Sequence, residues 1–185
     1  MNNSTGDYRI FVGAFPEGEL AERIQAVRLR HDAKTARITA PHVTMAGTYW
    51  RTGPATPENE HESIARLEGV QARLKPFDLA LGGVESFAPV NNVVYLHVEP
   101  AAGLLAARKV LLEALGPDKD RRYTPHLTLT MRLDRGETQA LLEELRQSEW
   151  HTGRWVALLD HVWLMQRGPG DAAWRYIYRV ELRGA

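Results

Sequence analysis

Two short segments of the chain repeat almost the same residues around a histidine. One reads PHVTMAG at residues 41–47, and the other reads PHLTLTM at residues 125–131. The chain holds 7 His and 10 Pro among its 185 residues. At random, two copies of the pattern proline, histidine, any residue, threonine would occur in roughly 2 of 10,000 such chains. The repeat therefore indicates a shared role for His42 and His126.

The spacing within each copy sorts the side chains by face. Residues two apart in a β-strand point to the same face of a sheet. His42 and Thr44 would therefore share one face, as would His126 and Thr128. The apolar residues between them would point into the core, and the proline would mark the start of each strand. If the two strands lie side by side, or face each other across a groove, two imidazoles and two hydroxyls converge.

These four side chains are suited to cutting a phosphodiester. Imidazole titrates near neutral pH, so one ring can take a proton from water while the other gives a proton to the leaving oxygen. Threonine hydroxyls can donate hydrogen bonds to the non-bridging phosphoryl oxygens, where negative charge accumulates in the transition state. A strained cyclic phosphate, which has a good internal leaving group, is the natural substrate candidate. A metal site is the weaker alternative, because catalytic zinc usually takes three protein ligands and the motifs supply two histidines.

The composition narrows the class of protein. Lysine plus arginine and aspartate plus glutamate both total 23, so the chain has no overall charge with which to hold long nucleic acid or an anionic membrane. The absence of cysteine excludes disulfides and thiolate catalysis. No stretch approaches the roughly 18 apolar residues of a membrane span, and the N-terminus does not resemble a signal peptide. We expect a cytoplasmic protein that needs no cofactor, membrane or obligatory protein partner, and any nucleotide ligand should be small or held by a local site.

Apolar periodicity and turn residues predict the elements that position the motifs. Each motif is expected in a strand that lies between two helices, and the second half of the chain repeats the order of the first, which indicates a structural duplication. Strands separated by helices, with hairpins expected at 76–100 and 155–182, predict an α+β protein of two sheet-and-helix lobes. Strands are expected at 9–15, 38–50, 76–87, 92–100, 124–133, 155–166 and 174–182, and helices at 17–32, 60–74, 103–116 and 137–149.

The paired H-x-T-x motifs, with apolar x, resemble those of the two-histidine (2H) phosphoesterase superfamily. Within this superfamily, the sequence resembles the bacterial RNA 2′,3′-cyclic phosphodiesterases, which are also called 2′-5′ RNA ligases. The segment RIFVGAFPEGEL at 9–20 is similar to that branch's opening strand and turn, and FDLALGGVESF at 77–87 is similar to a later strand. VWLMQRGPGDAAWRYIYRVEL at 162–182 is similar to its closing hairpin, so the resemblance covers nearly the whole chain.

The resemblance implies one domain over residues 1–185, built from two pseudo-symmetric α+β lobes. Each lobe would be an antiparallel sheet with helices packed outside, and the active site would lie in the cleft between the lobes. His42 would be the proton donor and His126 the proton acceptor, while Thr44 and Thr128 would hold the phosphoryl oxygens. The expected reaction converts the 2′,3′-cyclic phosphate of an RNA end or a small nucleotide into a 2′-phosphate.

Three alternatives stay open on the sequence. The substrate could be a 2′-5′ linked oligonucleotide, cut or ligated, or a cyclic phosphate derived from ADP-ribose. The chain could also be a non-catalytic module that binds an RNA end or a nucleotide, although binding alone requires no matched acid and base. The segment MAGTYW at 45–50 differs from the branch's usual continuation after the first motif, so we expect substrate choice to be decided there.

Other polar and aromatic residues are weaker candidates for the site. The segment DRRY at 120–123 could bring Arg121, Arg122 or Tyr123 to the cleft, where a guanidinium would meet phosphate and a ring would stack on a base; a solvated loop is the alternative. Arg132 shares the face of His126, but six residues of strand span about 20 Å, so it would meet only a longer substrate. The remaining histidines are expected to be structural or exposed. Tyr49, Trp50 and Phe87 could stack on a base, although aromatic residues of strands usually belong to the core.

Overall fold

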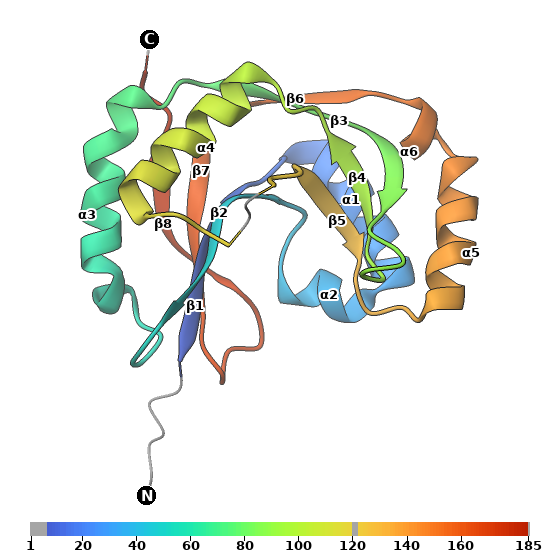
Figure 1. Ribbon diagram of the computed structural model, residues 1–185, viewed down its shortest axis with the longest axis horizontal. Helices are drawn as coiled ribbons and strands as arrows, with labels where there is room; N and C mark the ends of the chain where they lie inside the picture. The colour runs from blue at the N-terminus through green and yellow to red at the C-terminus, as the bar shows by residue number, and fades with distance from the viewer. Residues whose placement is uncertain (1–6, 120–121, 185) are drawn as a thin grey trace, which may run out of the picture.

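The two motif strands are neighbours at the centre of one antiparallel sheet. The computed structural model describes residues 7–119 and 122–184, and these residues form an eight-stranded sheet in the order β6-β3-β4-β5-β2-β1-β7-β8 (Figure 1). The first motif leads into β2 (Val43–Arg51), and the second opens β5 (His126–Thr130). A four-stranded half lies on each side of the boundary between β2 and β5. The predicted α+β fold with antiparallel strands is confirmed.

The elements follow the predicted order closely. One half holds β1 (Tyr8–Ala14), β2, β7 (His161–Arg167) and β8 (Arg175–Glu181), and the other holds β3 (Phe77–Ser86), β4 (Val94–Val98), β5 and β6 (Trp155–Leu159). The helices are α1 (Gly18–His31), α2 (Ala33–Ile38), α3 (His61–Val70), α4 (Ala102–Leu115), α5 (Arg135–Arg146) and α6 (Glu149–Thr152), with short 3₁₀ helices η1 (Pro57–Glu60) and η2 (Gln71–Arg73).

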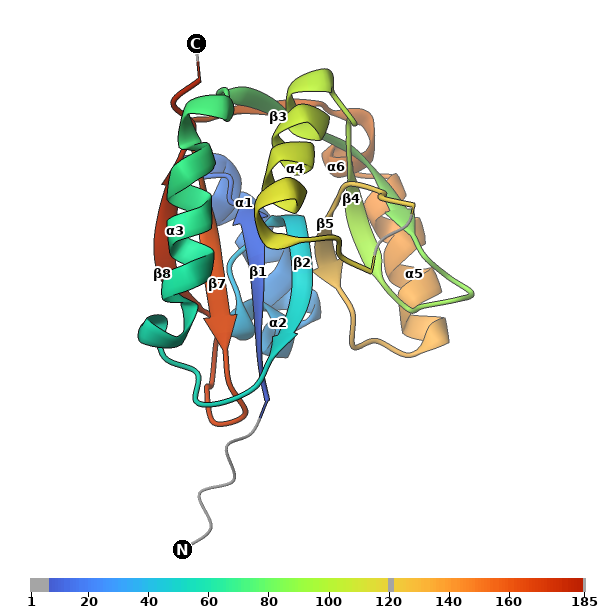
Figure 2. The same cartoon turned by 60° about the vertical axis from the view of Figure 1, so that its left-hand side comes forward.

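The crossover helices tie the two halves together. Helix α1 connects β1 to β2 but packs against β5, and α4 connects β4 to β5 but packs against β2. In Figures 1 and 2, α3 and α4 lie together over the half that contains β2, while α5 lies beside β3 and β4. Each motif strand is therefore held by its own half and by the crossover helix of the other half.

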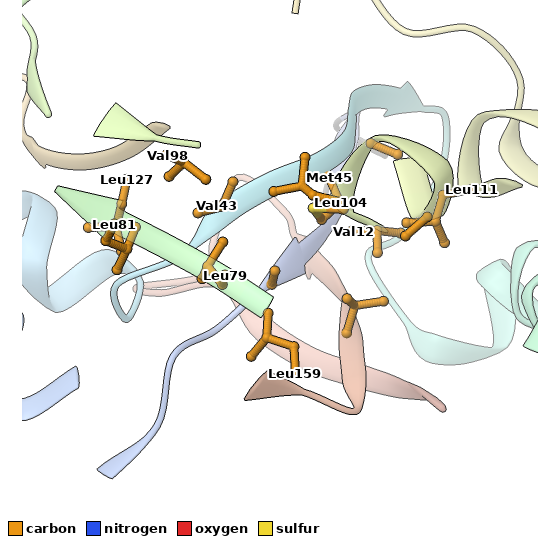
Figure 3. Packing of buried hydrophobic residues seen from close by; sticks show 14 of the residues in the cluster. Val12, Val43, Met45, Leu79, Leu81, Val98, Leu104, Leu111, Leu127 and Leu159 are labelled. Carbon is orange, nitrogen blue, oxygen red and sulfur yellow. The ribbon is translucent and has the colours of Figure 1, made fainter. Parts of the chain in front are cut away.

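The apolar residues of the motifs lie in the shared core, as the alternation predicts. Val43, Met45 and Leu127 are fully buried. Figure 3 shows these three side chains in the same cluster as Leu104 and Leu111 of α4. Burying a side chain of this size contributes about 1.5–3 kcal/mol, so the apolar side of each motif fixes which face the histidine and threonine occupy.

Two boundaries differ from the prediction. Residues 38–50 were expected to be extended, but α2 occupies 33–38 and β2 begins at Val43. Asp32 explains the helix, because its carboxylate accepts a hydrogen bond from Thr35 N at 3.0 Å and so caps the first turn. The other carboxylate oxygen accepts from Met131 N at 2.9 Å. Asp32 therefore fastens α2 to the end of β5.

The expected strand at 155–166 is two strands. Asp160 separates β6, at one edge of the sheet, from β7, which lies next to β1 in the other half. One residue spans about 3.3 Å, so the sheet must curl until the end of β6 meets the start of β7. Within the described part of the chain, no helix has the length and apolar character required to cross a membrane.

Candidate active site

The pairing of β2 with β5 brings the four motif side chains together. Val43 lies opposite Leu127 in an antiparallel register. One step away on either side, His42 comes opposite Thr128 and Thr44 comes opposite His126, on the face away from the core. Opposite residues have Cβ atoms about 4.5–5.5 Å apart. The seam between the two halves thus presents a square with a histidine at each end of one diagonal and a threonine at each end of the other.

The ring of His42 is held by its own segment. Nδ1 donates a hydrogen bond to the carbonyl oxygen of Ala40 at 2.9 Å, which leaves Nε2 as the nitrogen that can exchange a proton with a ligand. The ring stacks on Phe11 at 4.9 Å and on Phe15 at 5.3 Å between centroids. A Cβ at Gly13 would lie 2.7 Å from the Phe11 ring and 2.8 Å from the Phe15 ring. Glycine at this position therefore lets both rings reach the imidazole.

His126 is held in the same way by the second motif. Its Nδ1 donates to the carbonyl oxygen of Thr124 at 2.7 Å, again two residues upstream. The ring meets Phe87 at 5.0 Å and Tyr95 at 5.2 Å between centroids, in edge-on arrangements. In both copies a proline lies between the histidine and its carbonyl partner, and it keeps the preceding residue extended. The repeated phrase therefore sets the tautomer and the direction of each imidazole.

Burial, with smaller contributions from the charges of Arg28 and His126, lowers the pKa of His42 to about 4, although the hydrogen bond to Ala40 acts in the opposite direction. The β2–β5 pair places the two imidazoles on one diagonal, close enough for the charge of His126 to act on His42. His42 is therefore neutral at pH 7 in the ligand-free protein. An anion bound beside the ring would raise the pKa again, because a nearby opposite charge favours the protonated form.

A cavity of about 310 Å³ opens beside the motif residues. His42, Thr44 and Thr128 line it together with residues of α1, α2, β1, β7 and the segment after β5, whereas His126 is not among the lining residues. Among the described residues, no three histidine or acidic side chains are grouped as they would be around a metal ion. The lining residues are Arg9, Phe11, Arg28, Thr35, Ile38, Thr39, His42, Thr44, Thr48, Thr128, Met131, Arg132, Arg167 and Trp174.

The weaker candidates lie in different places. Arg132 lines the cavity, which corrects the expectation that it lies far along the strand, because β5 ends at Thr130 and the chain turns. Arg122 is exposed and does not line the cavity. Arg121 lies outside the described residues. Tyr123 is also not among the lining residues; its hydroxyl donates to the carbonyl oxygen of Thr44 at 2.9 Å.

The three aromatic candidates, Tyr49, Trp50 and Phe87, also lie in different environments. Phe87 contacts His126, as described above. Tyr49 is buried and its hydroxyl donates to the carbonyl oxygen of Gly116 at 2.8 Å. Trp50 is 55% exposed, and the guanidinium of Arg9 lies 5.3 Å from its ring centroid. Thr48, in the segment where we expected substrate choice to be decided, lines the cavity.

Sequence reasoning missed several residues of this site. Phe11, Gly13 and Phe15 alternate along one strand and could have been recognised as one face. Arg28 falls on the apolar stripe of α1, four residues after Ile24, where an arginine requires a special environment. His97, one of the histidines expected to be structural or exposed, lies directly opposite His126 in the β4–β5 ladder.

A buried ion pair braces the motif strands from the core side. The guanidinium of Arg108 on α4 makes two hydrogen bonds to Asp118, at 2.8 and 2.9 Å, and donates a third to Met45 O at 2.7 Å. Asp118 also accepts from Gly47 N at 3.2 Å. The Tyr123 ring stacks under Arg108 at 3.8 Å. This brace, formed by Arg108, Asp118 and Tyr123, joins the backbone of β2 to the segment that leads into His126.

The brace borders a wider depression of about 520 Å³ on the outer side of α4. Leu105, Leu112 and Pro117 line it together with Arg108 and Tyr123. It is larger than the cavity at the motifs, but neither motif histidine lines it. We therefore place the chemistry at the smaller cavity, which His42, Thr44 and Thr128 line; His126 does not line it but lies across the β2–β5 pair from these residues.

The lowered pKa of His42 predicts a specific loss of stability in acid. In the unfolded chain the ring takes up a proton near its ordinary pKa of 6.5, whereas the folded protein resists protonation until about pH 4. Stability is therefore complete above pH 6.5 and falls as the pH drops toward 4, by about 3 kcal/mol at most. Urea unfolding at pH 7 and pH 4 should show a larger loss in the wild type than in His42→Gln. Equal losses in the two proteins would contradict this assignment.

The fold and the site together define a class of protein. Two matched α+β halves with one His-x-Thr strand each, paired at the centre of an antiparallel sheet, are the arrangement of two-histidine phosphoesterases. The chain belongs to the 2′-5′ RNA ligase superfamily, whose family model matches residues 16–171.

Individual relatives agree with this assignment. The chain is 30% identical to a "Putative phosphoesterase" of Bacillus cytotoxicus over 139 residues, which cover 74% of this chain and 77% of that one. A protein of Bacillus anthracis with the same kind of name matches with the same identity and coverage. Among solved structures, Escherichia coli LigT complexed with NADP⁺ has a TM-score of 0.65, 21% identity and coverage of 96% and 99% of the two chains. The protein TT0787 of Thermus thermophilus has a TM-score of 0.57, 20% identity and coverage of 95% and 98%. These two structures confirm the fold.

Proposed function

We propose that the protein is a metal-independent cyclic phosphodiesterase that hydrolyses RNA or nucleotide 2′,3′-cyclic phosphates to 2′-phosphates. The observation that carries the proposal is the pairing of β2 with β5, which sets two imidazoles and two hydroxyls around one position. Each imidazole has its Nδ1 occupied by a backbone carbonyl. Two proton-transfer groups in fixed tautomers are what a displacement at phosphorus requires at its two ends.

The proposed reaction is a single displacement. His126 accepts a proton from a water molecule as the water oxygen attacks phosphorus. The bond from phosphorus to the 3′ oxygen breaks, and His42 gives its Nε2 proton to that oxygen. Thr44 and Thr128 donate hydrogen bonds to the non-bridging oxygens, where charge increases in the transition state. The products are a 3′ hydroxyl and a 2′-phosphate.

This assignment requires His42 to be protonated when the substrate is bound. The ligand-free ring has a pKa of about 4, so the phosphodiester itself must supply the negative charge that raises it. Substrate binding and protonation of His42 are then coupled. The donor becomes charged only when the anion that needs its proton is present.

The proposed function is tested with a panel of phosphodiesters in the presence of a chelator. The panel contains nucleoside 2′,3′-cyclic phosphates, a 2′-5′ linked dinucleotide and ADP-ribose 1″,2″-cyclic phosphate, with products separated by chromatography. We expect turnover of the 2′,3′-cyclic compounds and accumulation of the 2′-phosphate. Loss of activity on chelation, or cleavage of the 2′-5′ linkage alone, would overturn the proposal. If nucleotides raise the melting temperature but nothing is turned over, the protein is a binding module.

A further inference from the structure

Four arginines line the cavity beside His42, although the chain as a whole has equal numbers of basic and acidic residues. They are Arg9 from β1, Arg28 from α1, Arg132 from the turn after β5, and Arg167 from the end of β7. No aspartate or glutamate is among the described residues that line this cavity. The Asp32 carboxylate, which does not line the cavity, acts on Arg28 and Arg132. Four cations from four separate segments against this one acid leave the cavity positive, which favours an anionic ligand.

Two buried polar atoms of residues that line this cavity, Arg28 Nε and Thr35 Oγ1, make no hydrogen bond within the described chain. Arg28 is 1% exposed, and its Nη1 donates to Gln25 Oε1 and to Thr39 O, each at 2.8 Å. Its Nε, however, has no hydrogen-bond partner among the described residues. Thr35 is 5% exposed, and its Oγ1 lies near the Asp32 carboxylate but makes no hydrogen bond of normal geometry within the described chain. Buried donors are normally satisfied, so a ligand with several acceptor oxygens would complete this site.

The arginines extend beyond the reach of one phosphate. Thr44 lies opposite Gly13 of β1, and Arg9 is four residues further back along that strand, about 13 Å away. Arg9 lies opposite Arg167 of β7. The Arg9 guanidinium is held between Trp50 and Trp174, at 5.3 and 5.4 Å from the ring centroids. A phosphate placed between the motif histidines would therefore leave this end of the cavity for another anionic group.

We propose that the substrate carries a second phosphate beside the one that is cut, and that Arg28, Thr35 and the far pair Arg9 and Arg167 bind it. The inference rests on the proposed function, because it takes the motif residues as the position of the reacting phosphate. A second phosphate at this spacing can be the 5′-phosphate of a mononucleotide or the next phosphodiester of an RNA end. Charge-assisted hydrogen bonds from arginine to phosphate would make the protein prefer substrates with a second phosphate over substrates without one.

Turnover of three substrates tests the proposal. They are adenosine 2′,3′-cyclic phosphate, the same compound with a 5′-phosphate, and a dinucleotide that ends in a 2′,3′-cyclic phosphate. We expect kcat/KM to be about 10- to 100-fold higher for the two compounds with a second phosphate. A larger gain for the dinucleotide identifies an RNA end as the source, and a larger gain for the 5′-phosphate identifies a mononucleotide. Equal kcat/KM for all three overturns the proposal while leaving the proposed function intact.

Variants locate the effect in the cavity. Arg9→Gln and Thr35→Val should each reduce the preference for the second phosphate to a few-fold or less. Thr35→Val keeps the size of the side chain and the backbone N–H that donates to Asp32, so it should fold normally. Arg66→Gln, at an exposed arginine on α3, is the matched control and should keep the full preference. A preference that survives both cavity variants overturns the assignment.

A binding measurement keeps the test independent of catalysis. Titration calorimetry with adenosine 2′,5′-bisphosphate and adenosine 2′-monophosphate compares ligands that differ by the second phosphate alone. We expect the bisphosphate to bind about 10-fold or more tightly, and Arg9→Gln to remove most of that difference. If no cyclic phosphate is hydrolysed, the proposed function fails but this comparison still decides the subsite. Equal affinity of the wild type for the two ligands would overturn the proposed second phosphate site.

Discussion

Replacing His126 by alanine is expected to lower kcat for 2′,3′-cyclic phosphate hydrolysis by about 100- to 10,000-fold. His126 is the proposed acceptor of the proton from water, and its Nδ1 is already used by Thr124 O, so its Nε2 has no substitute in the motif. His42→Ala should cause a loss of the same order, because the 3′ oxygen would have to leave without a proton. Initial rates with a nucleoside 2′,3′-cyclic phosphate measure both effects.

The two histidines can be told apart by the leaving group. A nucleoside p-nitrophenyl phosphodiester releases a stable anion that needs no protonation. His42→Ala should therefore retain most of its activity on this ester, whereas His126→Ala should remain inactive. The reverse pattern would exchange the two roles. His61→Ala, on an exposed histidine of α3, is the matched control and should behave as the wild type, and melting temperatures near the wild-type value would show that the site variants are folded.

Replacing Arg108 by methionine is expected to lower the free energy of unfolding by about 3–5 kcal/mol. The Arg108 and Asp118 side chains are 7% and 2% exposed, so the change leaves a carboxylate in the interior without its main partner. Arg108 also holds the carbonyl oxygen of Met45 in β2. Because this brace sets the position of both motif strands, kcat should fall as well, even though Arg108 lies on the opposite side of the sheet from the cavity. Urea unfolding at pH 7 measures the stability change.

A surface ion pair provides the control for this prediction. Arg73 pairs with Glu113 on the surface, where the two side chains are 53% and 44% exposed. Arg73→Met should cost at most about 1 kcal/mol, because solvent screens exposed pairs. The double change Arg108→Met/Asp118→Leu should recover part of the lost stability, since it removes the buried carboxylate together with the guanidinium that pairs with it. A loss in Arg108→Met no larger than that in Arg73→Met would show that the buried pair is not a structural brace.

The orientation of the motif side chains could be predicted from the sequence because it depends only on neighbouring residues in the same strand. Alternation along a strand places His42 and Thr44 on one face and Val43 on the other, whatever the rest of the chain does. The burial of Val43 and Leu127 then leaves one face for the polar groups. The paired motifs indicated the family and named four candidate site residues, while the order of strands and helices predicted the α+β class.

Boundaries were less predictable where tertiary contacts compete with local preference. Residues 33–38 form a helix because the Asp32 carboxylate caps the first turn and also accepts from Met131 N, a partner 99 positions away. The break at Asp160 depends on the curl of the whole sheet, since β6 and β7 join different halves. Neither contact is visible in a short window of sequence.

By itself, the sequence determined that two His-Thr strands exist and that their polar faces oppose an apolar core. It did not determine which side chains surround those faces. Arg9, Arg28 and Arg167 come from three segments far apart along the chain, and only the strand order and the packing of α1 bring them to one cavity. The motif side chains share a face because they are two residues apart in a strand, and this spacing can be read from the sequence. The residues that surround the substrate are brought together by strand pairing and helix packing between distant segments, which the apolar periodicity of the sequence does not reveal.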